Sequence, residues 1–395
     1  MLAGTFFTEV EGFCLNQSIA DISLTKAATQ LWDAVVIGAG PAGAASAFLL
    51  AQEGFKVLIV EKKTFPRAKV CGCCLSGRAV RQLEHLGLSE VLTRAIPLKS
   101  FVLKSASQSV QLPTAGGVVL SRTELDYNLL QRAVSAGADL IQGSTAILGQ
   151  VNDHSRTITL HSPAETVSLE AKLILCCSGL GEIPHNSGEE INVDVEKNSK
   201  IGVAAIVDSG NWIESQTIEM IVDRAGYVGL VQLEDGKLNL AAALNRATIK
   251  QAGGVTQVIS GMLERTGFGT KLSAFEPQWQ GTLPITRQLR CPAFPRTFVL
   301  GDAAGYVEPF TGEGIAWAFE SAELVQSLAG QAIHNWKPQF VQDWNFHHQK
   351  LVRRRQLTCK IIKRMLDTPW LIRPAINLLS IAPQISRPFV RSIHG

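Results

Sequence analysis

The clearest pattern of hydrophobic and polar positions lies near the beginning of the chain. An apolar run, Ala34–Ile37, predicts a buried strand, and a glycine-rich turn and an Ala- and Leu-rich helix to about Glu53 follow it. Gly54 ends that helix, and a second apolar run, Val57–Val60, predicts another strand. The pattern therefore indicates a strand–helix–strand unit with two parallel strands.

A second strand–turn–helix pattern lies in the last third of the chain. The apolar run Thr297–Leu300 predicts a strand, the glycine-rich turn Pro309–Gly314 follows, and a helix is expected from about Ile315. Between the two patterns, residues 97–119 and about 190–285 alternate apolar and polar positions, as half-buried strands do. In that region Glu234-Asp235-Gly236 is typical of a hairpin turn.

Composition identifies a folded protein and favours a reducing compartment. The 395 residues, 46% of them hydrophobic and 18% charged, are enough for two or three domains with a large core. The eight cysteines lack the spacing of a secreted disulfide framework, so a cytoplasmic location fits best. The first residues have no basic region of a signal peptide, and no run of about 18 apolar residues predicts a transmembrane helix.

Charge is concentrated in the last part of the chain. Residues 351–395 contain nine Arg or Lys and one acid, Asp367, so they carry a net charge of +8 while the first 350 residues carry −5. Two interpretations remain open. The segment could contact an anionic membrane surface peripherally, or it could form helices that pack on the body through residues such as Trp370 and Ile376 and present a basic face to solvent.

The first turn has the spacing of a dinucleotide-binding fingerprint. It reads Gly38-Ala39-Gly40-Pro41-Ala42-Gly43, with one glycine for the tight turn, one for close approach of a pyrophosphate and one for helix–strand packing. A pyrophosphate is expected at the N-terminus of the following helix. At the end of the second strand, Glu61 is placed to accept hydrogen bonds from a ribose, and Lys62 follows it among the predicted cofactor residues. The fingerprint alone does not distinguish NAD from FAD.

The second pattern supplies the distinction. Gly301-Asp302 stands at a strand end, where an Asp can accept from a ribityl hydroxyl, and the helix that begins after Gly312 points its N–H groups at a flavin. With GDAAG followed by P-x-TGEGI, the chain resembles the geranylgeranyl reductase-like branch of the FAD-dependent hydroxylase superfamily. The resemblance implies bound FAD, with Gly301, Asp302, Gly312, Gly314 and Ile315 among its contacts.

Two shorter segments extend the resemblance. PRAKVCGCCLS matches a family segment along the isoalloxazine edge and implies that Lys69 and Cys71 lie near the flavin. Cys71 is thus a candidate catalytic residue, whereas Cys73 and Cys74 are interpreted as packing residues. RTELD resembles a segment in which Arg122 approaches the flavin and Asp126 begins a helix, although taken alone Arg122 would be an exposed charge. No second cysteine pair at knuckle spacing follows, so no metal site is predicted.

We therefore predict an α/β fold in which a Rossmann-like FAD-binding domain is interleaved with an antiparallel β-sheet substrate domain, with C-terminal helices added. The predicted boundaries are 1–30 for an N-terminal extension, 31–96, 120–189 and 286–335 for the FAD-binding domain, 97–119 and 190–285 for the substrate domain, and 336–395 for the basic helical segment. Gly229 replaces a tryptophan that relatives carry and suggests extra room in the substrate pocket.

Three functions fit this resemblance. The favoured one is a reductase that passes hydride from flavin N5 to a C=C bond of a hydrophobic, isoprenoid or lipid-like substrate. A monooxygenase that hydroxylates a phenol or quinol through a C4a-hydroperoxide is the alternative, and a flavoprotein electron relay without its own substrate is a third. The W-x-W-x-I-P segment of flavin halogenases is missing, which argues against halogenation. The electron donor, NAD(P)H or a redox protein, is left open, and no nucleic-acid partner is expected.

Overall fold

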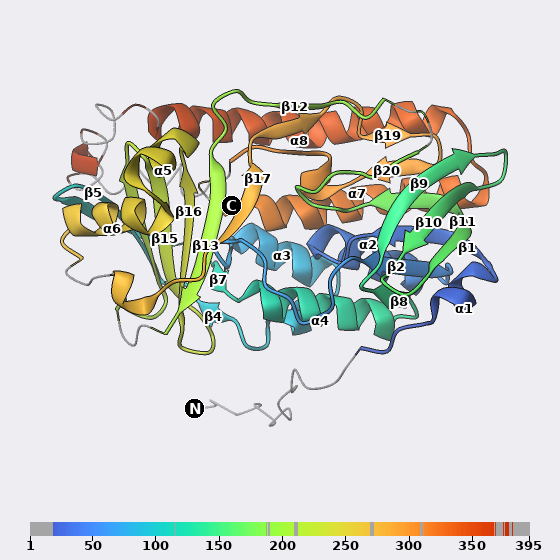
Figure 1. Ribbon diagram of the computed structural model, residues 1–395, viewed down its shortest axis with the longest axis horizontal. Coiled ribbons are helices and arrows are strands. Elements are labelled where there is room, and N and C mark those ends of the chain that lie inside the picture. Colours follow the sequence, from blue (N-terminus) through green and yellow to red (C-terminus); the bar gives the residue numbers. More distant parts are fainter. Residues whose placement is uncertain are drawn as a thin grey trace, which may run out of the picture.

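The computed structural model describes residues 19–114, 116–186, 188, 190–208, 212–268, 272–308, 310, 312–366, 368, 374, 376–378 and 381. Its two main sheets lie at opposite ends of the long axis, with α-helices between and above them (Figure 1). The predicted α/β class is confirmed.

The first sheet has eight strands and carries the predicted strand–helix–strand unit. Its order is β19-β20-β11-β1-β2-β8, with β10 paired to β11 and β9 to β10. The strands from β20 to β8 pair in parallel. The bounds are β1 Leu31–Ile37, β2 Val57–Glu61, β8 Asp139–Gln142, β9 Thr145–Val151, β10 Arg156–His161, β11 Thr166–Cys176, β19 Ala293–Phe294 and β20 Thr297–Val299.

Three helices cover one face of this sheet: α2 (Pro41–Gln52), α4 (Arg122–Ser135) and α7 (Gly314–His334). All residues of α2 from Pro41 to Ala51 are buried, which its mostly small and apolar side chains allow, with Ser46 as the polar side chain among them. Helix α4 begins at Arg122, where Ser121 accepts a hydrogen bond from the Glu124 N–H, so the expectation that a helix begins at Asp126 is wrong by one turn.

The second sheet has seven strands in the order β17-β13-β16-β15-β14-β5-β6. The predicted hairpin turn joins β15 to β16, where the Leu233 N–H donates to the Lys237 carbonyl at 2.8 Å. One pair departs from the antiparallel expectation, because β14 and β5 are parallel. The bounds are β5 Ser100–Ser105, β6 Gln108–Pro113, β13 Ile201–Val207, β14 Thr217–Asp223, β15 Gly226–Gln232, β16 Leu238–Leu244 and β17 Gln280–Pro284.

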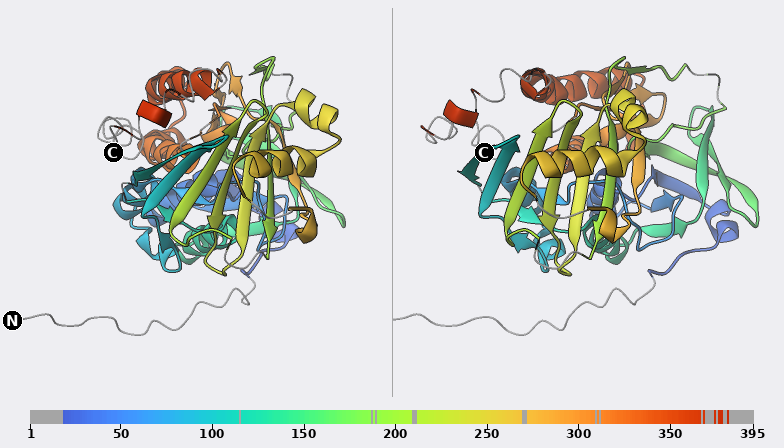
Figure 2. Two further views of the ribbon diagram at one scale, coloured as in Figure 1. Left: turned by 90° about the vertical axis from the view of Figure 1, so that its left-hand side faces the viewer. Right: turned by 60° about the vertical axis from the view of Figure 1, so that its left-hand side comes forward.

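Two helices that the alternation pattern did not predict, α5 (Arg246–Ala252) and α6 (Val255–Arg265), lie across the outer face of this sheet (Figure 2, yellow and gold). Val258, Ile259, Met262 and Leu263 of α6 are buried with Val228 and Leu230 of the sheet. Their spacing along the chain is that of one helix face. The opposite face of the sheet is therefore the one left to form a cavity wall.

Short elements connect the two parts. A three-stranded sheet joins β3 (Cys74–Leu75), β7 (Val118–Val119) and β4 (Ile96–Pro97), and another joins β12 (Val193–Val195), β18 (Arg287–Leu289) and β21 (Gly305–Tyr306). The remaining elements are α1 Leu24–Ala28, α3 Gly77–His85, η1 Ser89–Leu92, η2 Leu272–Phe275 and η3 Gly301–Ala303. The described part of the predicted N-terminal extension packs on the first sheet, since the Trp32 indole N–H donates to the Ala27 carbonyl at 2.9 Å.

The C-terminal helix α8 (Gln339–Leu366) packs against the body beside α7. Trp344 is fully buried and its indole N–H donates to the Val299 carbonyl at 3.2 Å. Beyond the helix, Ile376 is only 1% exposed, whereas Trp370 lies outside the described residues. The packed interpretation of residues 351–395 is thus supported at Ile376, and Trp344 anchors the helix that leads into it. No helix among the described residues is both long and apolar enough to span a membrane.

Candidate active site

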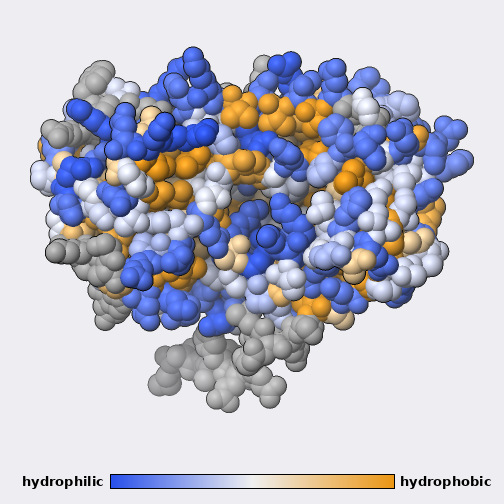
Figure 3. Space-filling view, in the orientation of Figure 1, coloured by the Kyte–Doolittle hydropathy of each residue, from blue (hydrophilic) through white to orange (hydrophobic). Residues whose placement is uncertain are grey.

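A single cavity of about 950 Å³ extends from the first glycine-rich turn to the inner face of the seven-stranded sheet. Its walls include Gly38 and Glu61 at one end and Phe101 and Tyr227 at the other. On the face seen in Figure 3, hydrophilic side chains gather in a hollow near the middle of the molecule. The cavity thus joins a polar, cofactor-like end to an apolar end.

The glycine-rich turn has the close contacts that the fingerprint requires. Gly38 has φ of +104°, and a Cβ there would lie 2.4 Å from the Cys177 carbonyl oxygen. A Cβ on Gly43 would lie 1.9 Å from the Gly38 carbonyl oxygen. Only glycine fits at these two positions, because the methyl group of any other residue would overlap backbone atoms. The turn and the start of α2 are therefore held by packing within the protein itself.

Gly40 differs from its two neighbouring glycines, because a Cβ there would meet no atom closer than 3.9 Å. The atoms at that distance are guanidinium nitrogens of Arg67 and Arg122. A backbone turn at a helix N-terminus with two cations beside it is suited to a pyrophosphate.

These cations are held by acids. Asp126 binds Arg122 through two contacts of 2.8 Å and Arg67 through one of 3.3 Å. Arg122 is 7% exposed, so it is not the surface charge that its sequence context alone would suggest. Glu61 accepts from the Ala39 N–H at 3.0 Å and lies 3.4 Å from Arg67.

Two buried polar atoms on this wall lack a hydrogen-bond partner among the described residues, the Ser178 hydroxyl and Nε of Arg67. Buried polar atoms usually have partners, and those without one point to a ligand or water. Together with the open space over Gly40, they fit the phosphate-rich middle of a flavin dinucleotide.

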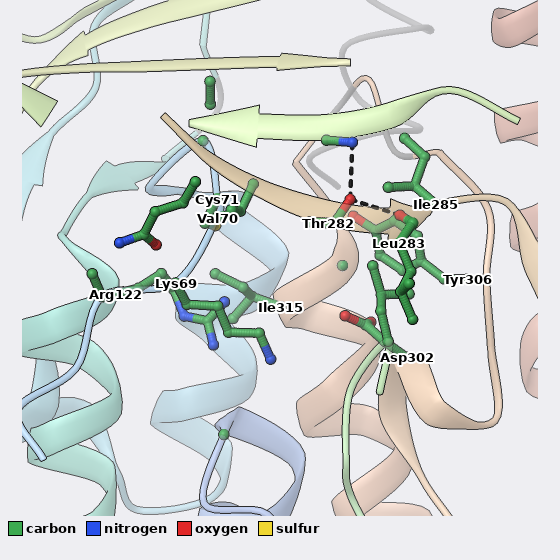
Figure 4. A pocket seen from close by; sticks show the side chains of 18 of the residues that line it. Lys69, Val70, Cys71, Arg122, Thr282, Leu283, Ile285, Asp302, Tyr306 and Ile315 are labelled. Carbon is green, nitrogen blue, oxygen red and sulfur yellow. Dashed lines mark hydrogen bonds between the residues drawn. The ribbon is translucent and has the colours of Figure 1, made fainter. Parts of the chain in front are cut away.

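Lys69, Arg122 and Asp302 surround the next part of the cavity, with Ile315 between them in the view of Figure 4. Burial lowers the pKa of Lys69, the Arg122 charge lowers it further, and Asp302 acts in the opposite direction. Burial raises the pKa of Asp302, while Lys69 and Arg122 counteract the rise. A carboxylate that faces two cations across a cavity can orient ligand hydroxyl groups.

Cys71 faces the same space, above Arg122 in Figure 4. A hydrogen bond from the Cys73 thiol lowers the pKa of Cys71, burial works against this, and the positive charge of Arg122 lowers the pKa further. The thiolate form is therefore favoured at neutral pH. A thiolate is a poor proton donor, so Cys71 is better suited to an electrostatic or nucleophilic role than to that of an acid.

The N-terminus of α7 brings Gly312, Gly314 and Ile315 to the cavity wall. Tyr306 packs over it, since a Cβ on Gly314 would lie 3.1 Å from the Tyr306 ring. Burial, with a smaller contribution from Asp302, raises the pKa of Tyr306 well above its usual value. Its phenol therefore stays protonated and can donate a hydrogen bond into the cavity.

Aromatic and aliphatic side chains form the far end. The Phe310 ring contacts Tyr227 edge-on with centroids 5.0 Å apart, and contacts Phe101 in the same way at 6.3 Å. At Gly229, a Cβ would lie 3.4 Å from the terminal methyl group of Met220. Gly229 does line the cavity, but the flexible Met220 chain takes up part of the room that the glycine leaves.

The structure brings eleven of the predicted cofactor residues to one cavity. They are Gly38, Gly40, Glu61, Lys62, Lys69, Cys71, Arg122, Asp302, Gly312, Gly314 and Ile315. The other four, Pro41, Ala42, Gly43 and Gly301, do not line it; Gly301 instead packs on α2, where its Cβ would meet that of Ala42 at 3.0 Å.

Sequence reasoning missed several lining residues, among them Arg67, Ser178, Met220 and Tyr306. Arg67 stands within the segment that was matched, so its position beside Lys69 was the available signal. Among the described residues, no group of three or more His, Cys, Asp or Glu side chains is arranged to hold a metal ion.

Comparisons with known proteins agree with this geometry. The family model described as "FAD binding domain" matches residues 32–335. Menaquinone reductase of Mycobacterium tuberculosis is 27% identical over 316 residues, which cover 75% of this chain and 76% of the relative. Digeranylgeranylglycerophospholipid reductase 2 of Methanothermobacter thermautotrophicus is 26% identical over 331 residues, 77% of this chain and 79% of the relative.

Among solved structures, the flavin-dependent brominase Bmp2 superposes with a TM-score of 0.77 at 15% identity, covering 92% of this chain and 94% of that one. At this identity the likeness concerns the fold alone.

Proposed function

Because the chain belongs to the FAD binding domain family and is a FAD-dependent oxidoreductase, we propose that it reduces C=C bonds of a hydrophobic, isoprenoid or lipid-like substrate. The observation that carries the proposal is the continuity of the cavity. Its cofactor end opens directly into an apolar end walled by Phe101, Tyr227 and Phe310. A polar substrate would lose hydration there without finding hydrogen-bond partners, whereas an apolar chain gains from burial.

The names of the relatives support this substrate class. One is called a reductase of menaquinone, a prenylated quinone, and another a reductase of a geranylgeranyl phospholipid. Both names join reduction to a molecule that carries an isoprenoid chain.

When bound, FAD supplies the hydride for such a reduction. The residues of this chain bind the cofactor and orient the substrate beside it. Arg67 and Arg122, which lie beside Gly40, would neutralise the phosphates of the cofactor, and Asp302 would accept hydrogen bonds from its hydroxyl groups. Phe101, Tyr227 and Phe310 keep water from the reacting double bond.

Tyr306 is the candidate residue for donating a proton or a hydrogen bond to the substrate. It lies beside the start of α7, where Gly312, Gly314 and Ile315 reach the cavity, and its phenol remains protonated. We propose that its hydroxyl group donates a hydrogen bond to the substrate and supports its protonation. Cys71, held towards the thiolate, is proposed to contribute negative charge near the flavin rather than a proton.

The proposal is tested by single turnover. The protein with bound FAD is reduced without oxygen and mixed with menaquinone-4 or with geranylgeraniol, and the flavin absorbance is followed. The expected result is reoxidation together with a product two hydrogens heavier, in which fragmentation by mass spectrometry places the added hydrogens on the isoprenoid chain, because reduction of a quinone ring would add the same mass. Tyr306→Phe should slow reoxidation by about 10- to 100-fold while FAD stays bound.

The monooxygenase alternative is tested on the same reduced protein by admitting oxygen with a phenol or quinol present. Hydroxylated product with no reduction of either isoprenoid would replace the proposal. Reoxidation by oxygen alone, with neither product, would favour the electron relay. Titration with NADH, NADPH and a reduced ferredoxin identifies the donor class.

Membrane contact is proposed to be peripheral and to involve α8, on which Phe346 is 64% exposed. Binding to phosphatidylglycerol vesicles should fall as salt rises, because exposed cations act over about 8 Å at physiological ionic strength. If the protein does not bind these vesicles even at low salt, α8 only packs on the body and does not contact a membrane.

A further inference from the structure

Cys71 and Cys73 lie in contact on either side of Gly72. The Cys73 N–H donates to the Cys71 sulfur at 3.4 Å, and the Cys73 thiol lies 3.8 Å from the Cys71 carbonyl oxygen. The backbone folds back at this point because Cys73 has φ of +56°, in the left-handed region that favours glycine.

The fold gives the two sulfurs different access. Cys71 is half-buried and lines the cavity, whereas Cys73 is 3% exposed and packs behind it with Leu98 and Val119. A reagent entering the cavity therefore meets Cys71 first, and Cys73 can be reached only by its neighbour.

The charges around the pair are also unequal. The Cys73 hydrogen bond and the Arg122 guanidinium lower the pKa of Cys71. The pKa of Cys73 is raised well above its usual value by its hydrogen bond to Cys71 and by burial. An accessible thiolate beside a shielded thiol is the arrangement of an attacking and a resolving cysteine.

We propose that Cys71 and Cys73 form a reversible redox site, which closes to a disulfide by exchange with a small disulfide that enters through the cavity. The exchange needs no C=C substrate and is therefore a separate reaction, although it uses the Cys71 sulfur whose negative charge is proposed above to act near the flavin.

The exchange has two balanced steps. The Cys71 thiolate attacks one sulfur of the small disulfide, forms a mixed disulfide and expels a thiolate, which takes the proton of the Cys73 thiol. Cys73 then attacks the Cys71 sulfur, forms the intramolecular bond and releases the second thiolate, which takes a proton from water. The two cysteines lose two electrons, and the small disulfide becomes two thiols.

Geometry favours this pair over the others in the segment. A disulfide needs Cα atoms about 4.4–6.8 Å apart, a range that residues two apart commonly meet, and the Cys73 N–H already lies 3.4 Å from the Cys71 sulfur. The Cys74 thiol instead donates to the Gly72 carbonyl at 3.2 Å and its residue lies in β3. Because the ring that joins Cys71 to Cys73 is small, the bond is expected to be strained and easily reduced, as regulatory disulfides are.

Closure would change the cavity. It removes the negative charge that faces Arg122, so the site beside the cofactor becomes more positive. The oxidation state of the pair is thereby expected to alter the flavin absorbance spectrum.

The test uses the full chain with FAD bound, exposed to mixtures of reduced and oxidised glutathione, quenched in acid and alkylated with N-ethylmaleimide. Trypsin releases residues 70–78, VCGCCLSGR, which contain all three cysteines of the segment. The expected peptide from oxidised samples carries one alkyl group instead of three, and fragmentation places that group on Cys74. Dithiothreitol should restore three alkyl groups.

Two variants sharpen the result. Cys73→Gly suits the positive φ and should fold, and it is expected to stop at a glutathione adduct on Cys71. Cys74→Ser, the matched control, should still form the intramolecular bond. Bound flavin and the circular dichroism spectrum verify that each variant is folded.

Three alkyl groups on the wild-type peptide at every glutathione ratio would overturn the proposal. So would an intramolecular bond that persists in Cys73→Gly.

Discussion

The glycine-rich turn at the polar end of the cavity is one continuous stretch of chain, whereas the apolar end is assembled from distant strands. Gly38, Gly40 and Glu61 all belong to one strand–helix–strand unit. At the apolar end, β14 pairs with β5, so that Thr217 lies opposite Ser100. The motif that marks the cofactor end is thus local, although Arg122, Cys177 and Asp302 complete that end, while the substrate end has no such local motif.

The two ends of the cavity therefore differ in the substitutions that they can accept. The turn at Gly38 is fixed by contacts between backbone atoms and accepts no side chain. The wall at Gly229 and Met220 is made of side chains that can change size without moving the strands. Cofactor binding is therefore expected to be sensitive to small changes, and substrate preference to be adjustable.

The strongest way to break the local end is Gly38→Ala. A methyl group would overlap the Cys177 carbonyl at a φ of +104°, so we expect a loss of about 3 kcal/mol or more of unfolding free energy and no bound FAD. Gly40→Ala is the matched control, since its methyl group has room in the protein itself. It should keep the melting temperature of the FAD-free protein but bind FAD at least about tenfold more weakly. Equal stability of both FAD-free variants would contradict the assigned roles.

Local motifs explain why the cofactor end could be predicted from the sequence. The spacing of Gly38, Gly40 and Gly43 and the acid at Glu61 predicted the turn, because the pattern lies in one short stretch even though the Cys177 carbonyl that excludes a side chain at Gly38 is distant in the chain. The resemblance added Lys69, Arg122 and Asp302, and the structure brings all three to the same cavity.

The substrate end could not be predicted in the same way. Helix α6 was not predicted although Val255, Val258, Ile259 and Met262 follow a helical spacing, because the alternating positions and turn residues around them favour strands. β14 and β5 pair in parallel although they are more than one hundred residues apart in the chain, and no local sequence pattern predicts such a pairing. Tyr306 and Met220 reach the cavity through such long-range packing.

The next test concerns the contribution of the C-terminal segment to the apolar end. Ile376 is buried with Val110, Leu112 and Tyr227, so Ile376→Ala should cost about 2–5 kcal/mol of unfolding free energy. Leu378, two residues on, is 52% exposed, and Leu378→Ala should change stability by no more than about 0.5 kcal/mol. Chemical denaturation of the two variants measures the difference. If both values were near zero, the segment would not belong to the core of this end.

At the boundary between the ends, Asp302→Ala should weaken FAD binding without unfolding the protein. Removing an acceptor from a buried hydroxyl costs about 1–3 kcal/mol, which is roughly a 5- to 150-fold rise in the dissociation constant. Asp235→Ala, in the exposed hairpin turn, is the control and should bind FAD as the wild type does. Fluorescence titration of the FAD-free proteins gives both constants, and an unchanged constant for Asp302→Ala would remove this residue from the cofactor site.

The smallest expected effect is at the cavity wall formed by Gly229 and Met220. Gly229→Leu places its Cβ at an ordinary contact distance of 3.4 Å from Met220, so the strand should accept it while the rest of the side chain enters the cavity. FAD content should stay unchanged, and KM for a hydrophobic substrate should rise about tenfold, which corresponds to about 1.4 kcal/mol. Adding Met220→Ala returns volume at the same place and should recover part of the lost affinity. Steady-state kinetics with isoprenoid substrates of increasing chain length should show the largest rise in KM for the longest substrate. A loss of FAD in Gly229→Leu would mean that a change at the substrate end also disturbs the cofactor end. A KM that does not depend on the length of the substrate would mean that Gly229 does not line the substrate path.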